Sequence, residues 1–289
     1  MEKRIKKEGV VKIGYLGPEG TFSWKAAKML AKKYGKNVAL VPFPTFGNGL
    51  EILKGGEIDK LVFPVENSID GGIKAVLDTL QEFPSKFKIE NEMIVPIGQW
   101  LLGIKGAKIK DIKTIYSKQE ALEQCQRFIL ENKIEAKFTS STGKAAQIIS
   151  HVNSKEQAAI GPKWLTEFYR EIRIIGKRVD DNQSNATRFI IFGKNSSEPT
   201  RNDKTSIIFT IADKPGSLAK VLDIFVALDI NMTKIESRPS KKKIGEYVFH
   251  IDISGHKKNK DVKIALRAIR MVTAKSLKVW SYPTYNLVI

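Results

Sequence analysis

The sequence predicts an α/β protein: a larger domain of two lobes, followed by a small domain with the element order βαββαβ. Two observations support this prediction. From Val11 onward, short apolar segments alternate with segments of helical periodicity, which favours a parallel sheet covered by helices. Lys194–Lys204 is polar and aperiodic, as linkers are. We therefore expect one domain over residues 11–194 and a second over residues 205–283.

The larger domain is expected to cross between its lobes near residues 94–98 and 180–187. The crossings would leave a cleft between the lobes, and ligand sites in such sheets favour interlobe crevices and strand carboxyl ends. The elements expected here are strand Val11–Leu16, helix Ser23–Lys33, strand Val38–Phe43, helix Phe46–Lys54, strand Thr114–Tyr116, helix Gln119–Asn132, strand Ala136–Thr139, helix Thr142–Ser150, strand Ala158–Ile160 and strand Asn185–Phe192.

The small domain has the order of a ferredoxin-like fold. Its expected elements are strand Thr205–Ile211, helix Gly216–Leu228, strands Ile230–Ser237 and Glu246–Ile253, helix Lys260–Val272 and strand Leu277–Tyr282.

The net charge of +18 leaves three interpretations open: a nucleic-acid surface, an anionic substrate, or a solvated lysine-rich surface. The excess is divided evenly, +9 in residues 1–199 and +9 in residues 200–289, and Lys241–Lys243 is its tight run. Nucleic-acid modules cluster their charge among aromatic residues. The pattern favours a solvated surface and no nucleic-acid partner.

No membrane contact is expected. The apolar stretch Met93–Ile104 is interrupted by Pro96 and Gly98, and it is shorter than the roughly 20 residues of a spanning helix. Met1–Val11 is basic and lacks the apolar segment of a signal peptide. We therefore expect a cytoplasmic protein.

The sequence also argues against a disulfide or a metal site. Cys125 is the single cysteine, which excludes an internal disulfide and a Cys-rich metal site. The three histidines, His151, His250 and His256, lack the spacing of metal ligands. No metal is expected.

Two segments place polar groups where strands end. In GYLGPEGTFS, Gly17 and Gly20 allow a tight turn, and Thr21 or Ser23 can cap a helix whose free N–H groups attract an anion. A plain strand-to-helix turn is the alternative.

In VFPVENSIDGGI, Glu66, Asn67 and Ser68 stand at the lip of a glycine-containing turn. Three adjacent polar groups suggest a binding site. The alternative is an ordinary strand end that Asn67 or Ser68 caps.

These motifs carry a family resemblance. GPEGTFS, PVENSIDGGI, IYSKQEALEQC (Ile115–Cys125) and NATRF (Asn185–Phe189) occur in the order found in prephenate dehydratases. The fold that this resemblance implies is a pair of α/β lobes like a type II periplasmic binding protein, which the periodicity permits. The reaction implied is the loss of CO₂ and water from prephenate to give phenylpyruvate, with no cofactor.

The resemblance assigns the chief catalytic role to the threonine of the TRF motif, Thr187. A threonine hydroxyl is weakly acidic, so placement and hydrogen bonding to the departing oxygen would matter most. Arg188 would clamp a substrate carboxylate or form a structural salt bridge. Glu66 would be an acid if burial protonates it, or an ordinary surface carboxylate.

By motif match, neutral side chains are expected to hold the substrate. Lys118, which follows Ser117, replaces the histidine that many family members have at this position, and it would attract carboxylates or face solvent. The substrate-binding residues expected are Thr21, Ser23, Asn67, Ser68, Ser117, Gln124 and Phe189.

DKPGSLAKVLDIF and INMTKIESRPS resemble the phenylalanine-binding ACT domain of these enzymes. Gly216 permits a close approach at a helix start, which suits a carboxylate, and Glu236 or nearby carbonyls could accept the ammonium group. Ser217 replaces the usual alanine, and ESRP could instead simply end a strand at Pro239. The effector-binding residues expected are Gly216, Ser217, Leu218, Asn231, Glu236, Ser237, Arg238 and Pro239.

ACT domains generally pair, so a homodimer or homotetramer is expected. Two alternative functions remain open: an arogenate dehydratase, and a noncatalytic protein that binds and senses amino acids. Chorismate mutase activity is not expected, because no helical domain precedes Val11.

Overall fold

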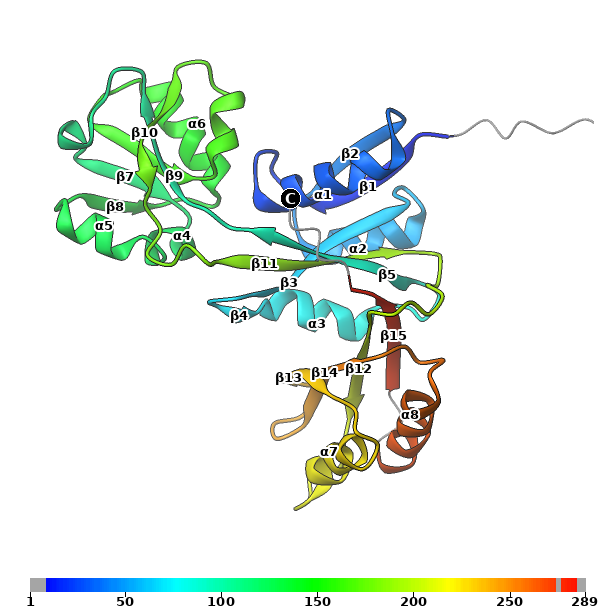
Figure 1. Cartoon of the computed structure of the whole chain (residues 1–289). Helices are drawn as coiled ribbons and strands as arrows, with labels where there is room; N and C mark the ends of the chain where they lie inside the picture. Colours follow the sequence, from blue (N-terminus) through cyan, green and yellow to red (C-terminus); the bar gives the residue numbers. More distant parts are fainter. Residues whose placement is uncertain (1–8, 274–276, 285–289) are drawn as a thin grey trace, which may run out of the picture. The chain divides into compact units, whose positions relative to one another are not determined.

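The computed structural model describes residues 9–273 and 277–284. Contacts divide the chain into two compact units (Figure 1). The first comprises the residues up to Thr45 together with Val95–Thr187, and the second comprises Phe46–Ile94 together with the residues from Arg188 onward. The boundary between Thr187 and Arg188 falls inside strand β11 (Ala186–Gly193).

In the first unit, strand β1 (Val11–Leu16) pairs in parallel with β2 (Val38–Phe43). Helix α1 (Phe22–Ala31) and the short 3₁₀ helix η1 (Lys32–Tyr34) connect them. The fully buried Ala26 and Ala27 belong to α1, and the small side chains permit close packing.

The first unit also contains a five-stranded sheet in the order β10-β6-β9-β7-β8. β7 is parallel to β8 and β9, whereas β6 is antiparallel to β9 and β10. The sheet is therefore mixed and not parallel throughout. The elements are β6 (Trp100–Ile104), η2 (Ile109–Asp111), β7 (Thr114–Ser117), α4 (Gln119–Glu123), α5 (Gln126–Glu131), β8 (Glu135–Phe138), α6 (Thr142–Val152), β9 (Gln157–Gly161), η3 (Lys163–Glu167) and β10 (Ile172–Arg178).

The prediction of one helix over Gln119–Asn132 is wrong, because α4 and α5 are separate helices. The carbonyl of Gln124 accepts a hydrogen bond from the N–H of Asp181 at 2.8 Å. Cys125 has φ −123° and ψ 22°, outside the helical range. A tertiary hydrogen bond thus takes the place of a helical one at the break.

In the second unit, β3, β11 and β5 are consecutive neighbours, and β4 pairs antiparallel with β3. Helix α3 was not predicted, although Val76, Leu77 and Leu80 have helical spacing and are buried. The rings of Phe83 and Phe192 stack with centroids 3.9 Å apart. The elements are α2 (Phe46–Gly55), β3 (Lys60–Asn67), β4 (Gly71–Gly72), α3 (Lys74–Glu82) and β5 (Lys88–Pro96).

The second unit also contains the predicted small domain. Its antiparallel sheet has the order β13-β14-β12-β15, and α7 and α8 pack on one face around Ile207, Phe209 and Ile251. Each predicted element is present, with ends within two residues of the prediction. The elements are β12 (Asp203–Thr210), α7 (Ser217–Ala227), β13 (Met232–Pro239), β14 (Tyr247–Ser254), α8 (Lys260–Val272) and β15 (Leu277–Pro283).

The other face of this small sheet packs on α3 and β5 of the same unit. Side chains alternate along a strand, so Lys278 and Trp280 point to the face opposite the helices. The Trp280 Nε1–H donates to the carbonyl of Phe87 at 3.1 Å. Lys278 Nζ donates to the carbonyls of Gln81 and Phe83, at 2.5 and 2.7 Å. The helix-free face is thus a packed surface.

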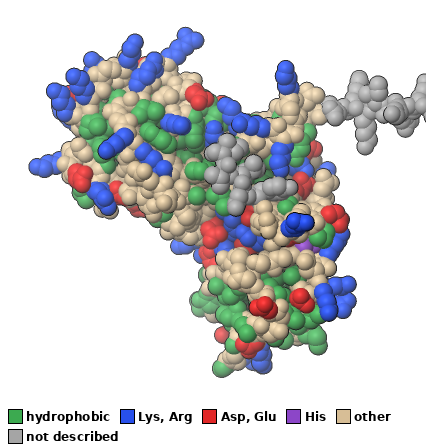
Figure 2. Space-filling view, in the orientation of Figure 1, with side chains coloured by type: hydrophobic (Ala, Val, Ile, Leu, Met, Phe, Trp, Pro, Cys, Tyr) green, Lys and Arg blue, Asp and Glu red, His purple; other side chains and the backbone are tan. Residues whose placement is uncertain are grey.

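Figure 2 shows lysine and arginine side chains spread over the visible face of the lobe that contains α6, with other residue types between them. This distribution agrees with the solvated basic surface that the sequence favours. Along residues 9–273 and 277–284, no helix is both long and apolar enough to cross a bilayer.

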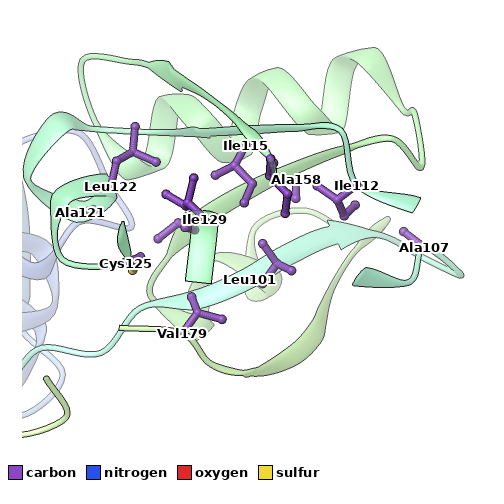
Figure 3. Close-up of a cluster of buried hydrophobic side chains, with 12 residues drawn as sticks. Leu101, Ala107, Ile112, Ile115, Ala121, Leu122, Cys125, Ile129, Ala158 and Val179 are labelled. Carbon is purple, nitrogen blue, oxygen red and sulfur yellow. The ribbon is translucent and has the colours of Figure 1, made fainter. Parts of the chain in front are cut away.

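Cys125 belongs to a buried cluster between the second sheet of the first unit and its helices (Figure 3). Its neighbours in the cluster include Leu122 and Ile129, and its side chain is fully buried. Burial, together with the nearby carboxylates of Asp180 and Asp181, raises the pKa of the Cys125 thiol. The thiol is a packing group that lacks the environment of a reactive thiolate.

We expect the native protein to resist a thiol reagent such as DTNB, with labelling at least about tenfold slower than in urea-unfolded protein. One equivalent should react once the chain unfolds, because Cys125 is the single cysteine. Cys125→Ala supplies the blank. Rapid native labelling would contradict the buried placement.

His250 lies on the helix-free face of the small sheet and is 5% exposed. Burial and the neighbouring Lys234 lower its pKa to about 4. Arg238 also lowers this pKa, whereas Asp252 and Asp78 raise it. The imidazole is therefore neutral in the folded protein near pH 7.

The unfolded chain binds a proton at His250 with a pKa of about 6.5, so stability should fall as the pH drops from 6.5 toward 4. At pH 5 the expected loss from this group is roughly 1–2 kcal/mol. Urea unfolding at pH 7.5 and 5.0 should show a smaller loss for His250→Gln than for wild type. His151→Gln, at an exposed position, should behave like wild type, and identical losses for all three proteins would refute this role.

Candidate functional site

Thr187 lies in the extended strand β11, and it is 7% exposed. Two residues earlier, the carbonyl of Asn185 accepts a hydrogen bond from the N–H of Ile97 at 2.8 Å. Thr187 and Phe189 share one face of the strand and Arg188 points to the other, as the alternation predicts. The hydroxyl of Thr187 is therefore held on a strand whose start is anchored by backbone hydrogen bonding.

Gln124, also in the first unit, is held by residues that the sequence did not single out. The Gln99 Nε2 group donates to Gln124 Oε1 at 3.5 Å, and the backbone N–H of Gln99 donates to Asp180 at 3.1 Å. Arg178 donates twice to Asp180, at 2.6 Å each. Gln99 and Asp180 lie outside the strands and Arg178 is the last residue of β10. No local pattern indicates that these three side chains meet.

Ser117 is fully buried at the end of β7, and its hydroxyl donates to the carbonyl of Ile160 in β9 at 2.7 Å. Its proton is thus engaged in joining two strands, and only its lone pairs remain as acceptors. Lys118 occupies the N-cap position of α4 without a capping hydrogen bond from its side chain, and its Nζ lies 3.8 Å from Glu120. The substrate-binding role of Ser117 stays a prediction.

Thr21 caps α1, as one of the two predicted possibilities: its Oγ1 accepts from the N–H of Trp24 at 3.2 Å and donates to the carbonyl of Leu16 at 3.3 Å. Ser23 is buried at 8% exposure. Gly20 has φ +84°, which favours glycine, and a Cβ there would lie 2.8 Å from Leu165 Cδ2. The glycine is required by both the turn and the packing.

In the second unit, Asn67 Oδ1 accepts from the N–H groups of Ile69 and Asp70, at 2.9 and 3.1 Å. This is the strand-end cap that the sequence left open as an alternative. Ser68 is exposed, whereas Phe189 is 1% exposed. A ligand could reach Ser68 from solvent, but Phe189 is part of the packed interior in this structure.

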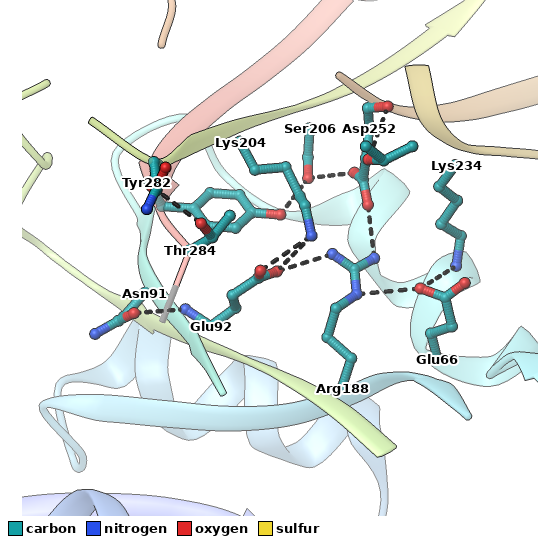
Figure 4. Close-up of polar contacts among 12 residues, drawn as sticks. Glu66, Asn91, Glu92, Arg188, Lys204, Ser206, Lys234, Asp252, Tyr282 and Thr284 are labelled. Carbon is teal, nitrogen blue, oxygen red and sulfur yellow. Dashed lines mark hydrogen bonds and ion pairs between the residues drawn. The ribbon is translucent and has the colours of Figure 1, made fainter. Parts of the chain in front are cut away.

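Arg188 is surrounded by three carboxylates, one for each guanidinium nitrogen (Figure 4). Nε donates to Glu66 at 3.1 Å, Nη1 to Glu92 at 3.0 Å, and Nη2 to Asp252 at 2.6 Å. Its side chain is 12% exposed. These contacts favour the structural salt bridge over the carboxylate clamp.

Two lysines complete a group of charges around Arg188 that is largely buried, with the Glu66 side chain 35% exposed. Lys204 Nζ lies 3.0 Å from both oxygens of Glu92, and Lys234 Nζ lies 3.8 Å from Glu66. We call this group the Arg188 cluster: Glu66, Glu92, Arg188, Lys204, Lys234 and Asp252. Three cations face three carboxylates, so the burial of each charge is compensated.

The electrostatics follow from this balance. Burial alone would lower the pKa of Arg188, but Asp252, Glu92 and Glu66 raise it well above its ordinary value. Burial would raise the pKa of Asp252, yet Arg188 and the Ser206 hydroxyl hold it below its usual range. Glu66 contacts two cations, which is the environment of an ion-pair carboxylate.

A cavity of about 230 Å³ opens at the start of α7. Gly216, with φ +78°, caps this helix. Three of the expected effector residues line the cavity, together with aromatic and charged residues that the sequence did not indicate. The lining includes Asp213, Gly216, Ser217, Leu218, Gly245, Tyr247 and Phe249.

Of the other expected effector residues, Ser237 lies opposite Phe249 and Pro239 opposite Tyr247 in the sheet register, on the cavity side. Asn231 is exposed and is not part of the lining.

Glu236 and Arg238 point to the helix-free face instead, because side chains alternate along β13. Arg238 Nε donates to Asp78 of α3 at 3.1 Å, and Glu236 lies 3.5 Å from Lys234. A Cβ at Gly72 would overlap the carboxylate of Glu236. These two residues therefore face the larger domain and not the cavity.

Comparison with known proteins gives two family matches: prephenate dehydratase over residues 13–197 and ACT domain over residues 205–270. A bifunctional chorismate mutase/prephenate dehydratase of Aquifex aeolicus is 34% identical over 96% of this chain and 74% of its own length. A prephenate dehydratase of Methanocaldococcus jannaschii is 32% identical over 94% of this chain and 98% of its own.

A solved structure supports the same assignment. Prephenate dehydratase of Arthrobacter aurescens, crystallised with L-Phe, superposes with a TM-score of 0.84 at 29% identity, over 94% of this chain and 90% of its own. The family match covers more than half of this chain and includes every expected catalytic residue. The chain therefore belongs to the prephenate dehydratase family, and it is a carbon–oxygen lyase of that family with an ACT domain.

Proposed function

We propose that this enzyme converts prephenate to phenylpyruvate in the cytoplasm, as a step of phenylalanine biosynthesis under allosteric control by phenylalanine. The observation that carries the proposal is the placement of Thr187 on the anchored start of β11, within the TRF motif. The family membership supplies the reaction class, and the cavity at Gly216 supports the control.

The main requirement of the reaction is that the protein places a hydrogen-bond donor at the departing oxygen. The ring carboxylate leaves as CO₂, its bonding electrons enter the ring, and the ring hydroxyl takes one proton and leaves as water. Thr187 would donate a hydrogen bond to that departing oxygen. Because the residue is buried, this hydrogen bond is stronger than it would be in water.

Thr187→Ala should lower kcat by about 10²- to 10³-fold, the usual effect of removing one hydrogen bond made in the transition state. Thr187→Ser keeps the hydroxyl and should retain most of the activity. Phenylpyruvate formation is followed in both variants, and thermal unfolding confirms that they fold. Full activity in Thr187→Ala would remove this catalytic assignment.

The same assay separates the alternatives. Turnover of arogenate in preference to prephenate would make the chain an arogenate dehydratase. No turnover of either substrate, with ligand binding retained, would make it a noncatalytic binding protein. Light scattering of the purified protein tests the dimer or tetramer that we propose from the ACT domain.

Regulation by phenylalanine is proposed from the cavity lined by Gly216, Ser217 and Leu218. Backbone N–H groups at the start of α7 would bind the effector carboxylate, and Tyr247 and Phe249 would contact its ring. The A. aurescens relative was solved with L-Phe, which supports the choice of this amino acid. Effector binding would act on catalysis through its different affinity for two states of the protein.

Arg238→Ala should weaken the phenylalanine response and leave basal turnover in place, because Arg238 ties β13 to Asp78 of α3. Lys241→Ala is the matched control: Lys241 also pairs with Asp78, at 2.7 Å, but its side chain is 66% exposed, so its contribution is small. Turnover is measured against phenylalanine concentration. Loss of basal activity in Arg238→Ala with an intact response would refute this division of roles.

A further inference from the structure

One carboxylate of the Arg188 cluster comes from the ACT domain. Asp252, on β14, accepts from Arg188 Nη2 at 2.6 Å and from the Ser206 hydroxyl at 2.5 Å. Ser206 also contacts the hydroxyl of Tyr282 at 2.6 Å. Asp252 is 6% exposed, and hydrogen bonds from Arg188 and Ser206, one to each carboxylate oxygen, fix its orientation (Figure 4).

Arg188 lies next to Thr187 on the same strand, with Cα atoms about 3.8 Å apart. Because successive side chains point to opposite faces, the orientation of Arg188 also sets that of Thr187. Glu66, which contacts Arg188, likewise precedes Asn67. Two members of the Arg188 cluster are therefore direct chain neighbours of predicted site residues.

We propose that Asp252 is a positioning residue for the dehydratase reaction: it acts through Arg188 to hold Thr187, so that turnover depends on a side chain of the ACT domain. The inference rests on the proposed function. A misplacement of about 1 Å can cost about 10²-fold in rate, so a modest shift of β11 is sufficient for a kinetic effect.

The same strand connects this contact to the proposed effector cavity. Tyr247 and Phe249 of β14 line the cavity, and Asp252 follows Phe249 by three positions, about 10 Å along the strand. A displacement of β14 by an occupied cavity would reach Asp252 without passing through another element. Asp252 is therefore a point at which the ACT domain acts on β11, and it is the one that reaches Arg188 by a hydrogen bond.

The chain offers a matched control for the loss of a buried carboxylate. Glu90 of β5 forms an ion pair with Lys60 of β3, and their side chains are 15% and 10% exposed. Glu90 lies on β5, two residues before Glu92, but neither Glu90 nor Lys60 adjoins a predicted site residue. Glu90→Gln reproduces the loss of a buried ion pair without touching Arg188.

Steady-state kinetics of Asp252→Asn test the catalytic effect. We expect kcat to fall by about 10- to 100-fold with KM changed less than about threefold, because an interaction made in the transition state is weakened. Asp252→Glu, which keeps the charge, should recover part of kcat. Glu90→Gln should keep kcat within about twofold even where its thermal stability falls.

A double-mutant cycle tests the route through Arg188. In the background of Arg188→Lys, the substitution Asp252→Asn should cause little additional loss of kcat, because the two residues act as a unit. Multiplied losses in the double variant would show that Asp252 acts independently of Arg188, and the inference would be overturned.

Hydrogen exchange separates this inference from the proposed function. Peptides that cover residues 186–190, away from the contact of Glu90 with Gly193, should exchange at least about tenfold faster in Asp252→Asn than in wild type, and Glu90→Gln should leave these rates unchanged. Faster exchange in an enzyme without dehydratase turnover would retain the coupling and reject the proposed function. Unchanged exchange, or equal kcat losses in Asp252→Asn and Glu90→Gln, would overturn the inference.

Discussion

The burial of the Arg188 guanidinium is the constraint on which the second unit depends. Each of its nitrogens contacts a carboxylate, and the carboxylates come from β3, β5 and β14. Breaking a buried ion pair leaves an uncompensated charge, which is strongly destabilising. The three strands must therefore keep their positions around one side chain, and the ACT domain is tied to the larger domain at that point.

This constraint explains why the helix-free face of the ACT sheet is polar. An exposed face of a sheet carries scattered charges, whereas here the charges have partners: Lys204 with Glu92, Arg238 with Asp78, and Asp252 with Arg188. If the contact between this face and the larger domain were purely apolar, the two surfaces could pack in several registers. Directional charge pairs favour one register, because each hydrogen bond requires its own geometry. The contact between the ACT sheet and the larger domain thus fixes the position of β11, and with it the position of Thr187, which precedes Arg188.

The sequence predicted a large part of the fold. The small domain was found with all six elements, because short runs rich in β-branched and aromatic residues in its strands and helical spacing in α8 are local signals. The second lobe is α/β as expected, but the sequence did not indicate that its sheet is mixed, and the break at Gln124 was missed. Strand direction and a hydrogen bond from Asp181 depend on residues far away in the chain, which periodicity does not report.

The sequence by itself determined the element order and the family motifs, including the alternation that turns Arg188 away from Thr187, because these depend on neighbours in the chain. Only the tertiary structure decided the partners. Glu66, Glu92 and Asp252 lie 122, 96 and 64 positions from Arg188, and no local pattern links them. Side-chain pairing between distant segments is set by packing and charge compensation in the folded chain, so it becomes visible only when the strands are in place.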